Sequence, residues 1–386
     1  MMKRIVPISI LLFSTSVYAD QDLTPYQRYQ QWLNNMLLEL GADGQFNPDK
    51  GVDWSVMPGP FYTPEKEFGI GVSAVGLYLP DLNDTVSQPS SITINGFGSI
   101  NGAYGIAVSN SNYLKQDKYR IFVNAEIIDS PDIFYGVGVQ AGRNNSRVDY
   151  DRRTYAASMT GLVRVLPNTY VGGGFEISQN EASKVKQQEP DNSWIGQDIA
   201  DFPEKQYNAG MMLTVSYDSR DFALNASEGR LVQLEYHNFN TAFGSDNDFE
   251  RVGLNYSEYY SLSAIPGVLA WQTRFESNFG DVSWDQMALL GGAEALRGYE
   301  QGHYRDKNML LSQIEYRQPL SGRHGMVYWV GAGTLADEFD EIGQDKWLTS
   351  VGIGYRFEIK QRVNLRLDMG FGNDQSGFYF AINEAF

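Results

Sequence analysis

In Asn364-Leu365-Arg366-Leu367-Asp368-Met369-Gly370-Phe371, apolar side chains occupy every second position. Successive side chains of a β-strand point to opposite faces, so this period of two predicts a strand with one apolar face and one polar face. The same alternation recurs in residues 269–276 and 312–317, where the polar face carries charged side chains. Charges on the inner faces of several strands favour a membrane barrel with a wet lumen and lipid outside over a soluble sandwich.

The composition agrees with a membrane protein built from strands. A chain of 386 residues would form two or three domains unless one large barrel takes up most of its length. Aromatic residues reach 13% and glycines number 39, as many strands joined by tight turns require. After the N-terminus the chain has no uncharged apolar stretch of about 18 residues, which excludes a helical transmembrane protein. The expected fold class is all-β: a transmembrane antiparallel β-barrel with a short N-terminal helix.

Charge and cysteine content exclude several classes of function. The chain has 30 basic and 47 acidic residues and a net charge of -17, which is the wrong sign for a nucleic-acid partner. It contains no cysteine, so disulfide frameworks, thiolate metal sites and cysteine catalysis are excluded. The three histidines, His237, His303 and His324, stand in no catalytic motif. We therefore expect a protein that is not an enzyme and that uses neither a cofactor nor a metal.

An acidic run near the C-terminal third leaves two interpretations open. It contains Asp337, Glu338, Asp340, Glu341 and Asp345. Such carboxylates could bind the divalent cations that bridge lipopolysaccharide phosphates. A solvated charged loop is the more ordinary explanation.

The chain begins with the pattern of a signal peptide. Lys3 and Arg4 form a charged segment, residues 5–13 are apolar, and a small-residue cleavage pattern ends at Ala19. We therefore assign residues 1–19 to a signal peptide that directs export. The apolar segment is too short to span a membrane as an anchor helix.

Residues 20–66 are expected to form a short periplasmic helix and a lead-in to the barrel. Thr24 and Pro25 suit the start of a helix, apolar residues follow at helical spacing, and Gly41 can end it. The helix could plug the barrel, lie on its rim, recruit a partner or pack on the barrel for stability.

Sixteen strands are expected in residues 67–386, which we assign to the barrel. Alternating runs and turn signals place their starts near Glu67, Ser91, Ala103, Lys118, Ile133, Asp151, Thr169, Gln206, Gly229, Phe249, Gly267, Lys307, Gly325, Lys346, Arg362 and Ser376. An even number is what a closed antiparallel barrel with both ends on the periplasmic side requires.

The connections between these strands alternate in length, which predicts long outer loops and short inner turns. The expected outer loops are Pro80 to Ser90, Glu181 to Lys205, Asp281 to Asp306 and Ala336 to Asp345. The expected inner turns include residues 167–168, 265–266 and 360–361.

Several motifs resemble one family of bacterial barrels. Leu290-Gly291-Gly292, then Leu296-Arg297-Gly298-Tyr299 and the Glu-Tyr-Arg-Gln-Pro-Leu of residues 315–320 resemble the loop-and-strand signature of the bacterial surface-antigen superfamily, which includes BamA, TamA and the two-partner secretion transporters. Residues 62–71 resemble its first strand. An inner-turn motif also resembles that family, with Asp218, Arg220, Asp221 and Gly229. The resemblance runs from about residue 58 to the C-terminus, in the family's order.

The resemblance implies that the sixth outer loop folds into the lumen and places Arg297 against the inner wall. A buried guanidinium needs a carboxylate. In the family this is an Asp in an aromatic-x-Asp-x-Gly stretch, but residues 329–333 carry Gly331 at that position, so the usual pair is expected to be absent. Asp368 is the first substitute, followed by Glu315 and Glu358. Alternatively, Arg297 is a solvated loop residue.

The C-terminal strand resembles the signal that the barrel-assembly machinery recognises during biogenesis. The apolar residues of this row are Phe378, Phe380, Ile382 and Phe386. Glu384 interrupts the row, which predicts weaker recognition or a position in the head-group layer.

The resemblance implies a multi-pass barrel in the outer membrane of a Gram-negative bacterium, surrounded by lipid and lipopolysaccharide. Residues 20–66 are too few for the N-terminal periplasmic (POTRA) domains, so we expect these domains to be absent. Its expected function is assembly or translocation of a client outer-membrane protein or lipid. The barrel would open at a seam between residues 67–79 and residues 376–386, because Gly69, Gly71 and Gly76 weaken the first strand. The alternative is a passive pore or surface structural protein without insertase activity.

Overall fold

The computed structural model describes residues 24–63, 66–144, 147–187, 205–344 and 347–386, in two compact units. The first unit ends at Glu39 and contains the predicted helix, α1 (Pro25–Glu39). Thr24 caps it, since its Oγ1 accepts a hydrogen bond from the Gln27 N–H at 3.2 Å, and Gln27 Oε1 accepts one from the Thr24 N–H at 2.9 Å. The predicted signal peptide, residues 1–19, lies outside the described residues.

The described helices are short. None of them is long and apolar enough to cross a membrane.

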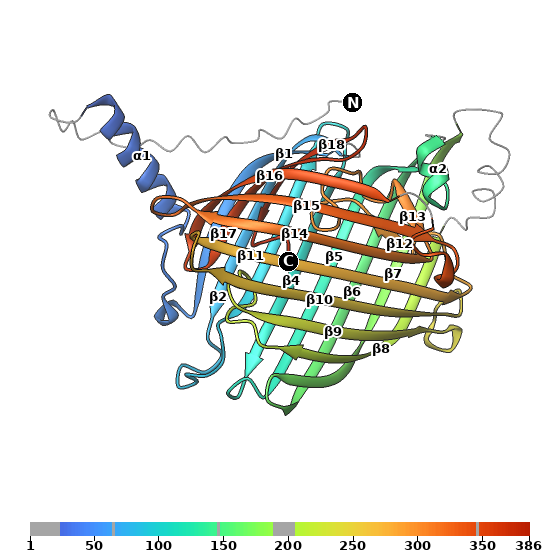
Figure 1. Ribbon diagram of the computed structural model, residues 1–386, viewed down its shortest axis with the longest axis horizontal. Helices are drawn as coiled ribbons and strands as arrows, with labels where there is room; N and C mark the ends of the chain where they lie inside the picture. The colour runs from blue at the N-terminus through green and yellow to red at the C-terminus, as the bar shows by residue number, and fades with distance from the viewer. Residues whose placement is uncertain (1–23, 64–65, 145–146, 188–204, 345–346) are drawn as a thin grey trace, which may run out of the picture. The chain divides into compact units, whose positions relative to one another are not determined.

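The second unit is a closed antiparallel barrel of sixteen strands, each paired with its neighbours in sequence (Figure 1). This confirms the predicted fold class and strand number. The wall strands are β1 (Val52–Thr63), β2 (Glu67–Tyr78), β3 (Ser90–Ser99), β4 (Tyr104–Leu114), β5 (Tyr119–Phe134), β6 (Val148–Leu166), β7 (Thr169–Gln187), β8 (Lys205–Asp218), β9 (Gly229–Phe239), β10 (Phe249–Leu262), β11 (Gly267–Gly280), β14 (Asn308–Pro319), β15 (His324–Ala336), β16 (Leu348–Lys360), β17 (Val363–Phe371) and β18 (Ser376–Ile382).

The wall is apolar outside and polar inside, the reverse of a soluble protein. In β8, the exposed side chains are Tyr207, Met211, Leu213, Val215 and Tyr217. The buried side chains that alternate with them are mostly polar, namely Gln206, Asn208, Met212, Thr214, Ser216 and Asp218. A sheet with this pattern is stable when lipid contacts its outer face.

The barrel begins at Val52, so the predicted start at Glu67 is wrong. The missed strand, β1, contains Pro58 and Pro60, and proline within a run argues against a paired strand because it donates no backbone hydrogen bond. Its side chains nevertheless alternate between buried and exposed along its whole length.

The separate strand expected near Ile133 is also wrong. Ile133 lies at the end of β5, and the short helix α2 (Val139–Asn144) follows before β6 begins at Val148. One strand, β1, was missed and one strand, near Ile133, was predicted in excess. The number of strands is therefore as expected, and so is the direction of every strand from β6 onward.

The same error misplaced one connection. Residues 80–90, expected as an outer loop, lie at the end of the barrel that holds the inner turns, since the Ala223 N–H donates to Gln88 Oε1 at 2.8 Å and the Gln116 N–H to Asp84 Oδ2 at 2.7 Å. The connection between β7 and β8 falls largely outside the described residues. The connections that follow β11 and β15 lie at the opposite end, as predicted.

Candidate functional site: the inserted loop and the barrel seam

The connection from β11 to β14 folds onto the inner face of the wall. It contains a two-stranded hairpin, β12 (Ala288–Leu290) with β13 (Tyr304–Asp306). The loop buries its apolar side chains against inward-facing residues of β14, β15 and β16. This cluster consists of Val139, Ala288, Leu290, Ala295, Leu296, Tyr299, Tyr304, Met309, Leu311, Leu335 and Leu348.

A glycine lets the tip of this loop approach the wall closely. Gly298 has a φ of 114°, and a Cβ at this position would lie 2.7 Å from backbone atoms of Phe371 in β17. Its N–H donates a hydrogen bond to the hydroxyl of Tyr379 at 3.0 Å. Only glycine combines this backbone conformation with this contact.

The side chain of Arg297 is fully buried beside this tip. Its Nη1 donates to Asp368 Oδ2 at 2.6 Å, and its Nη2 donates to Glu315. The guanidinium also stacks on the Trp329 ring, 3.8 Å from the ring centroid. The structure therefore brings together Arg297 and two of the three predicted partners, and the alternative of a solvated Arg297 is wrong.

The third candidate, Glu358, is not a partner of Arg297. It accepts a hydrogen bond from the Arg362 N–H at 3.0 Å. Asp368 pairs in register with Gly354, four residues before Glu358 on β16, which places Glu358 about 13 Å along the strand toward the barrel mouth.

The usual carboxylate is absent from β15, where Gly331 stands, and Asp368 on β17 takes its place as the partner of Arg297, as expected. At Gly331 the side chain of Leu296 takes the space, since a Cβ there would lie 3.3 Å from Leu296 Cδ1.

Three further arginines extend this cluster of buried charges. Arg356 Nη1 lies 2.5 Å from Asp368 Oδ1, Arg317 Nε lies 3.1 Å from Glu315 Oε2, and Arg366 Nη1 lies 3.8 Å from Asp368 Oδ2. Asp368 and Glu315, the two carboxylates that bind Arg297, therefore each contact a second arginine as well.

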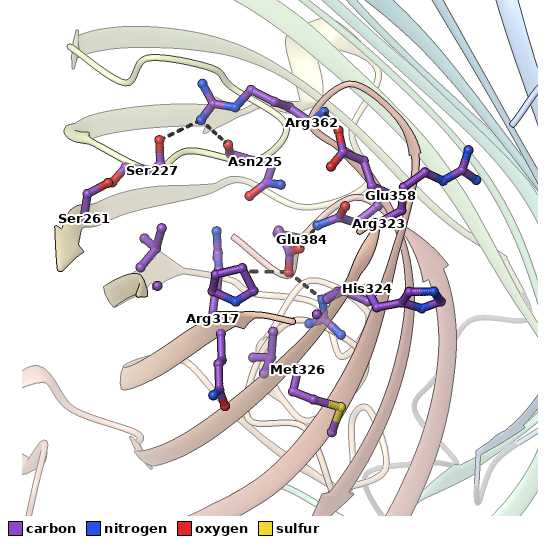
Figure 2. A pocket seen from close by; sticks show the side chains of 18 of the residues that line it. Asn225, Ser227, Ser261, Arg317, Arg323, His324, Met326, Glu358, Arg362 and Glu384 are labelled. Carbon is purple, nitrogen blue, oxygen red and sulfur yellow. Dashed lines mark hydrogen bonds and ion pairs between the residues drawn. The ribbon is translucent and has the colours of Figure 1, made fainter. Parts of the chain in front are cut away.

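Glu384 completes the cluster at the barrel mouth, so its predicted position in the head-group layer is wrong. Its side chain, labelled in Figure 2, is 2% exposed, and its Oε2 lies 2.8 Å from Arg356 Nε and 4.0 Å from Arg317 Nε. Burial alone would raise the pKa of Glu384, but the guanidinium groups of Arg356 and Arg317 outweigh it and lower that pKa to about 2. A cavity of about 440 Å³ opens beside it, lined also by Arg323 and Arg362.

The inner-turn motif joins three turns at this mouth. Asp218 accepts hydrogen bonds from Arg120 Nη1 at 2.7 Å and from Arg220 Nε at 2.9 Å. Asp221 lies 2.8 Å from Arg362 Nη2. Gly229 has a φ of 91°, and a Cβ there would overlap the Ser219 carbonyl. These contacts give the motif a structural role in holding the turns together.

The C-terminal row divides between the two faces of the wall. Phe378 and Phe380 are partly exposed and Ile382 is buried, whereas the last residue turns inward. The carbonyl of Phe386 accepts a hydrogen bond from Arg317 Nη2 at 2.8 Å. A Cβ at Gly59 of β1 would overlap the Phe380 ring, so this ring covers β1.

The barrel closes between β1 and β18, not between β2 and β18 as expected. β1 pairs with β2 over its whole length, from Val52 opposite Tyr78 to Thr63 opposite Glu67. Among the described residues, β1 and β18 share one pair in register, Tyr62 with Phe378. β18 is also the shortest wall strand. The seam is therefore weakly paired. It is formed by β1, and not by β2, whose glycines were expected to weaken it.

The histidines and the acidic run form no shared site in the described structure. His237 Nδ1 lies 3.1 Å from Glu176 in the lumen, His303 belongs to the inserted loop, and His324 begins β15. Asp337 pairs with Lys307 at 2.7 Å, and Asp345 lies outside the described residues.

Comparisons with known proteins agree with this geometry. A family model described as the Omp85 superfamily domain matches residues 93–386. No curated protein sequence matches the chain. Similar solved structures include BamA from Haemophilus ducreyi lacking POTRA domains 1–3 (16% identity, TM-score 0.53, 86% of this chain and 70% of that chain), CdiB from Acinetobacter baumannii (12%, 0.51, 86% and 59%) and CdiB from Escherichia coli (10%, 0.50, 88% and 62%). The chain spans less than two thirds of either CdiB. At these identities the likeness is one of fold.

Proposed function

Because the chain belongs to the Omp85 superfamily, we propose that it is an outer-membrane barrel that assembles or translocates a client protein or lipid at its seam. The apolar outer face supports a location in the outer membrane of a Gram-negative bacterium, in contact with lipid and lipopolysaccharide. The barrel-assembly machinery would insert the protein itself, guided by its C-terminal strand. We propose no enzymatic step.

The weak seam is the observation that carries this proposal. A strand edge with unpaired N–H and C=O groups is a template for another strand. The edge of β1 that faces β18 has one pair in register among the described residues, while its other edge is fully paired with β2. Pro58 and Pro60 have no N–H to donate, which further limits pairing along β1. A client strand that binds at this edge would therefore need to displace only a few existing hydrogen bonds between β1 and β18.

An insertion assay tests this function. Vesicles that contain the purified protein should insert urea-unfolded outer-membrane barrel polypeptides faster than vesicles that contain an equal amount of an unrelated barrel with a fully paired wall. The unrelated barrel controls for bilayer defects caused by any embedded protein. Equal rates in the two preparations would contradict an assembly function.

A passive pore is the second candidate, and the inserted loop argues against it. The loop occupies the inner face of β14–β17 and is fixed there by buried ion pairs. We therefore expect negligible steady conductance for the protein in planar bilayers. Steady open channels would instead favour the passive pore.

A further inference from the structure

Residues 40–51, the lead-in segment, fold back on β1. The Val56 N–H donates to the Leu40 carbonyl at 2.8 Å, and Ser55 Oγ donates to the Gly41 carbonyl at 2.7 Å. A short 3-10 helix, η1 (Pro48–Lys50), completes the segment. These contacts attach the segment to β1.

The same segment is bound to strands on the other side of the seam. The Gly44 N–H donates to the Ile359 carbonyl at 3.0 Å, and Arg323 Nη1 donates to the Ala42 carbonyl at 2.8 Å. Ile359 is the last residue but one of β16, and Arg323 lies in the turn between β14 and β15. In the order of the barrel, β18 and β17 stand between β1 and β16. The lead-in segment therefore crosses the seam.

A buried lysine forms the strongest part of this crossing. Lys360 Nζ lies 2.8 Å from Asp43 Oδ1 and 2.9 Å from Asp53 Oδ2, and its side chain is 0% exposed. Asp53 is 1% exposed. Burial would raise the pKa of Asp43, but hydrogen bonds from Lys360 and from the Gln45 N–H hold it below its usual range. Removing Lys360 would leave the buried Asp53 without the cation that reaches it from β16.

We propose that residues 40–51 are a latch that holds the seam shut at the mouth of the barrel, and that the seam opens when this latch is released. The latch acts at the end where β18 stops and backbone pairing no longer joins β1 to its neighbour. This inference rests on the proposed function, since it assigns a control to the same seam.

The chain offers a matched pair of lysines for the test. Lys50 Nζ also binds Asp53, at 3.0 Å, and lies 3.6 Å from Asp43, but it belongs to the segment itself and is 48% exposed. Among the residues that the structure describes, only Lys360 connects these carboxylates across the seam. Hydrogen–deuterium exchange in nanodiscs should show that Lys360→Met speeds amide exchange in β1 and β18 by about tenfold or more. Lys50→Met should leave both strands close to wild type, and β8 should not change in either variant.

A second variant, Arg323→Met, decides the test if Lys360→Met does not fold. Arg323→Met removes the donor to Ala42 and keeps the Lys360 ion pairs, so it should speed seam exchange in the same direction by a smaller factor. Heat-dependent migration on detergent gels confirms that each barrel is folded. Unchanged seam exchange in folded Lys360→Met would overturn the latch, and if that variant does not fold, unchanged exchange in Arg323→Met would do so. If exchange rises but the insertion assay fails for wild type, the latch stands and the proposed function falls.

Discussion

Arg297→Met is expected to destabilise the folded barrel by about 3 kcal/mol and to release the inserted loop. Arg297 is fully buried and bonds to Asp368 and Glu315 from the tip of the loop. Methionine fills similar space but leaves part of their negative charge uncompensated. The loss lies at the lower end of the range for a broken buried ion pair, because Arg356 and Arg317 still contact these carboxylates.

Two measurements check this expectation. Limited proteolysis should cut between residues 281 and 306 in the variant and not in the wild type, and the barrel should lose its heat-resistant gel migration at a lower temperature. Arg230→Met is the matched control. Arg230 pairs with Glu258 at 2.9 Å but is about half exposed, so its loss should cost less than about 1 kcal/mol. Equal proteolysis of wild type and Arg297→Met would mean that the ion pairs do not hold the loop.

A disulfide across the seam should abolish assembly activity. Tyr62 and Phe378 are the pair in register between β1 and β18, and directly opposed residues of antiparallel strands lie at a separation that a disulfide can bridge. The chain contains no cysteine, so Tyr62→Cys with Phe378→Cys introduces the single possible disulfide within the protein. Oxidation should stop client insertion and reduction should restore it.

The control for this lock joins two strands that already pair in register from Gly210 to Asp218 of β8. Val215 and Leu234 are opposed on β8 and β9, and both are 48% exposed on the outer face. A disulfide between cysteines at these positions should leave insertion unchanged. A seam-locked barrel that inserts clients as fast as its reduced form would show that lateral opening is not the mechanism.

The sequence predicted the parts of the fold that depend on local periodicity. Residues 364–371 alternate because β17 separates lumen from lipid, and the polar face of this strand correctly identified Asp368 as a partner of Arg297. β1 was missed because Pro58 and Pro60 argue against a strand when they are considered locally. In a barrel they are tolerated at the weakly paired edge, a property that only the closed topology shows.

Other features of the site depend on contacts between distant residues. Trp329, which stacks on Arg297, stands in the stretch 329–333 that the resemblance indicated, but that stretch pointed to a carboxylate and not to the ring. Tyr379, which bonds to Gly298, stands in no motif that indicates such a contact. Glu384 was expected near the head groups because the alternation of β18, if it continued to residue 384, would place this side chain on the outer face. The strand ends at Ile382, so the alternation stops there, and Arg356 binds the carboxylate inside the barrel. The lead-in contacts across the seam join residues 281 to 317 positions apart, beyond any local pattern.

Photocrosslinking in cells is the most direct test of seam-guided assembly. A photoreactive residue placed at Pro60 would lie on β1, and the same residue at Leu213 would lie on β8, where it is paired with both neighbouring strands. We predict adducts with newly exported outer-membrane polypeptides at position 60 and not at position 213, and their loss when the seam is locked by oxidation. Equal labelling at both positions, or labelling at position 60 that survives the lock, would contradict a client that enters at the seam.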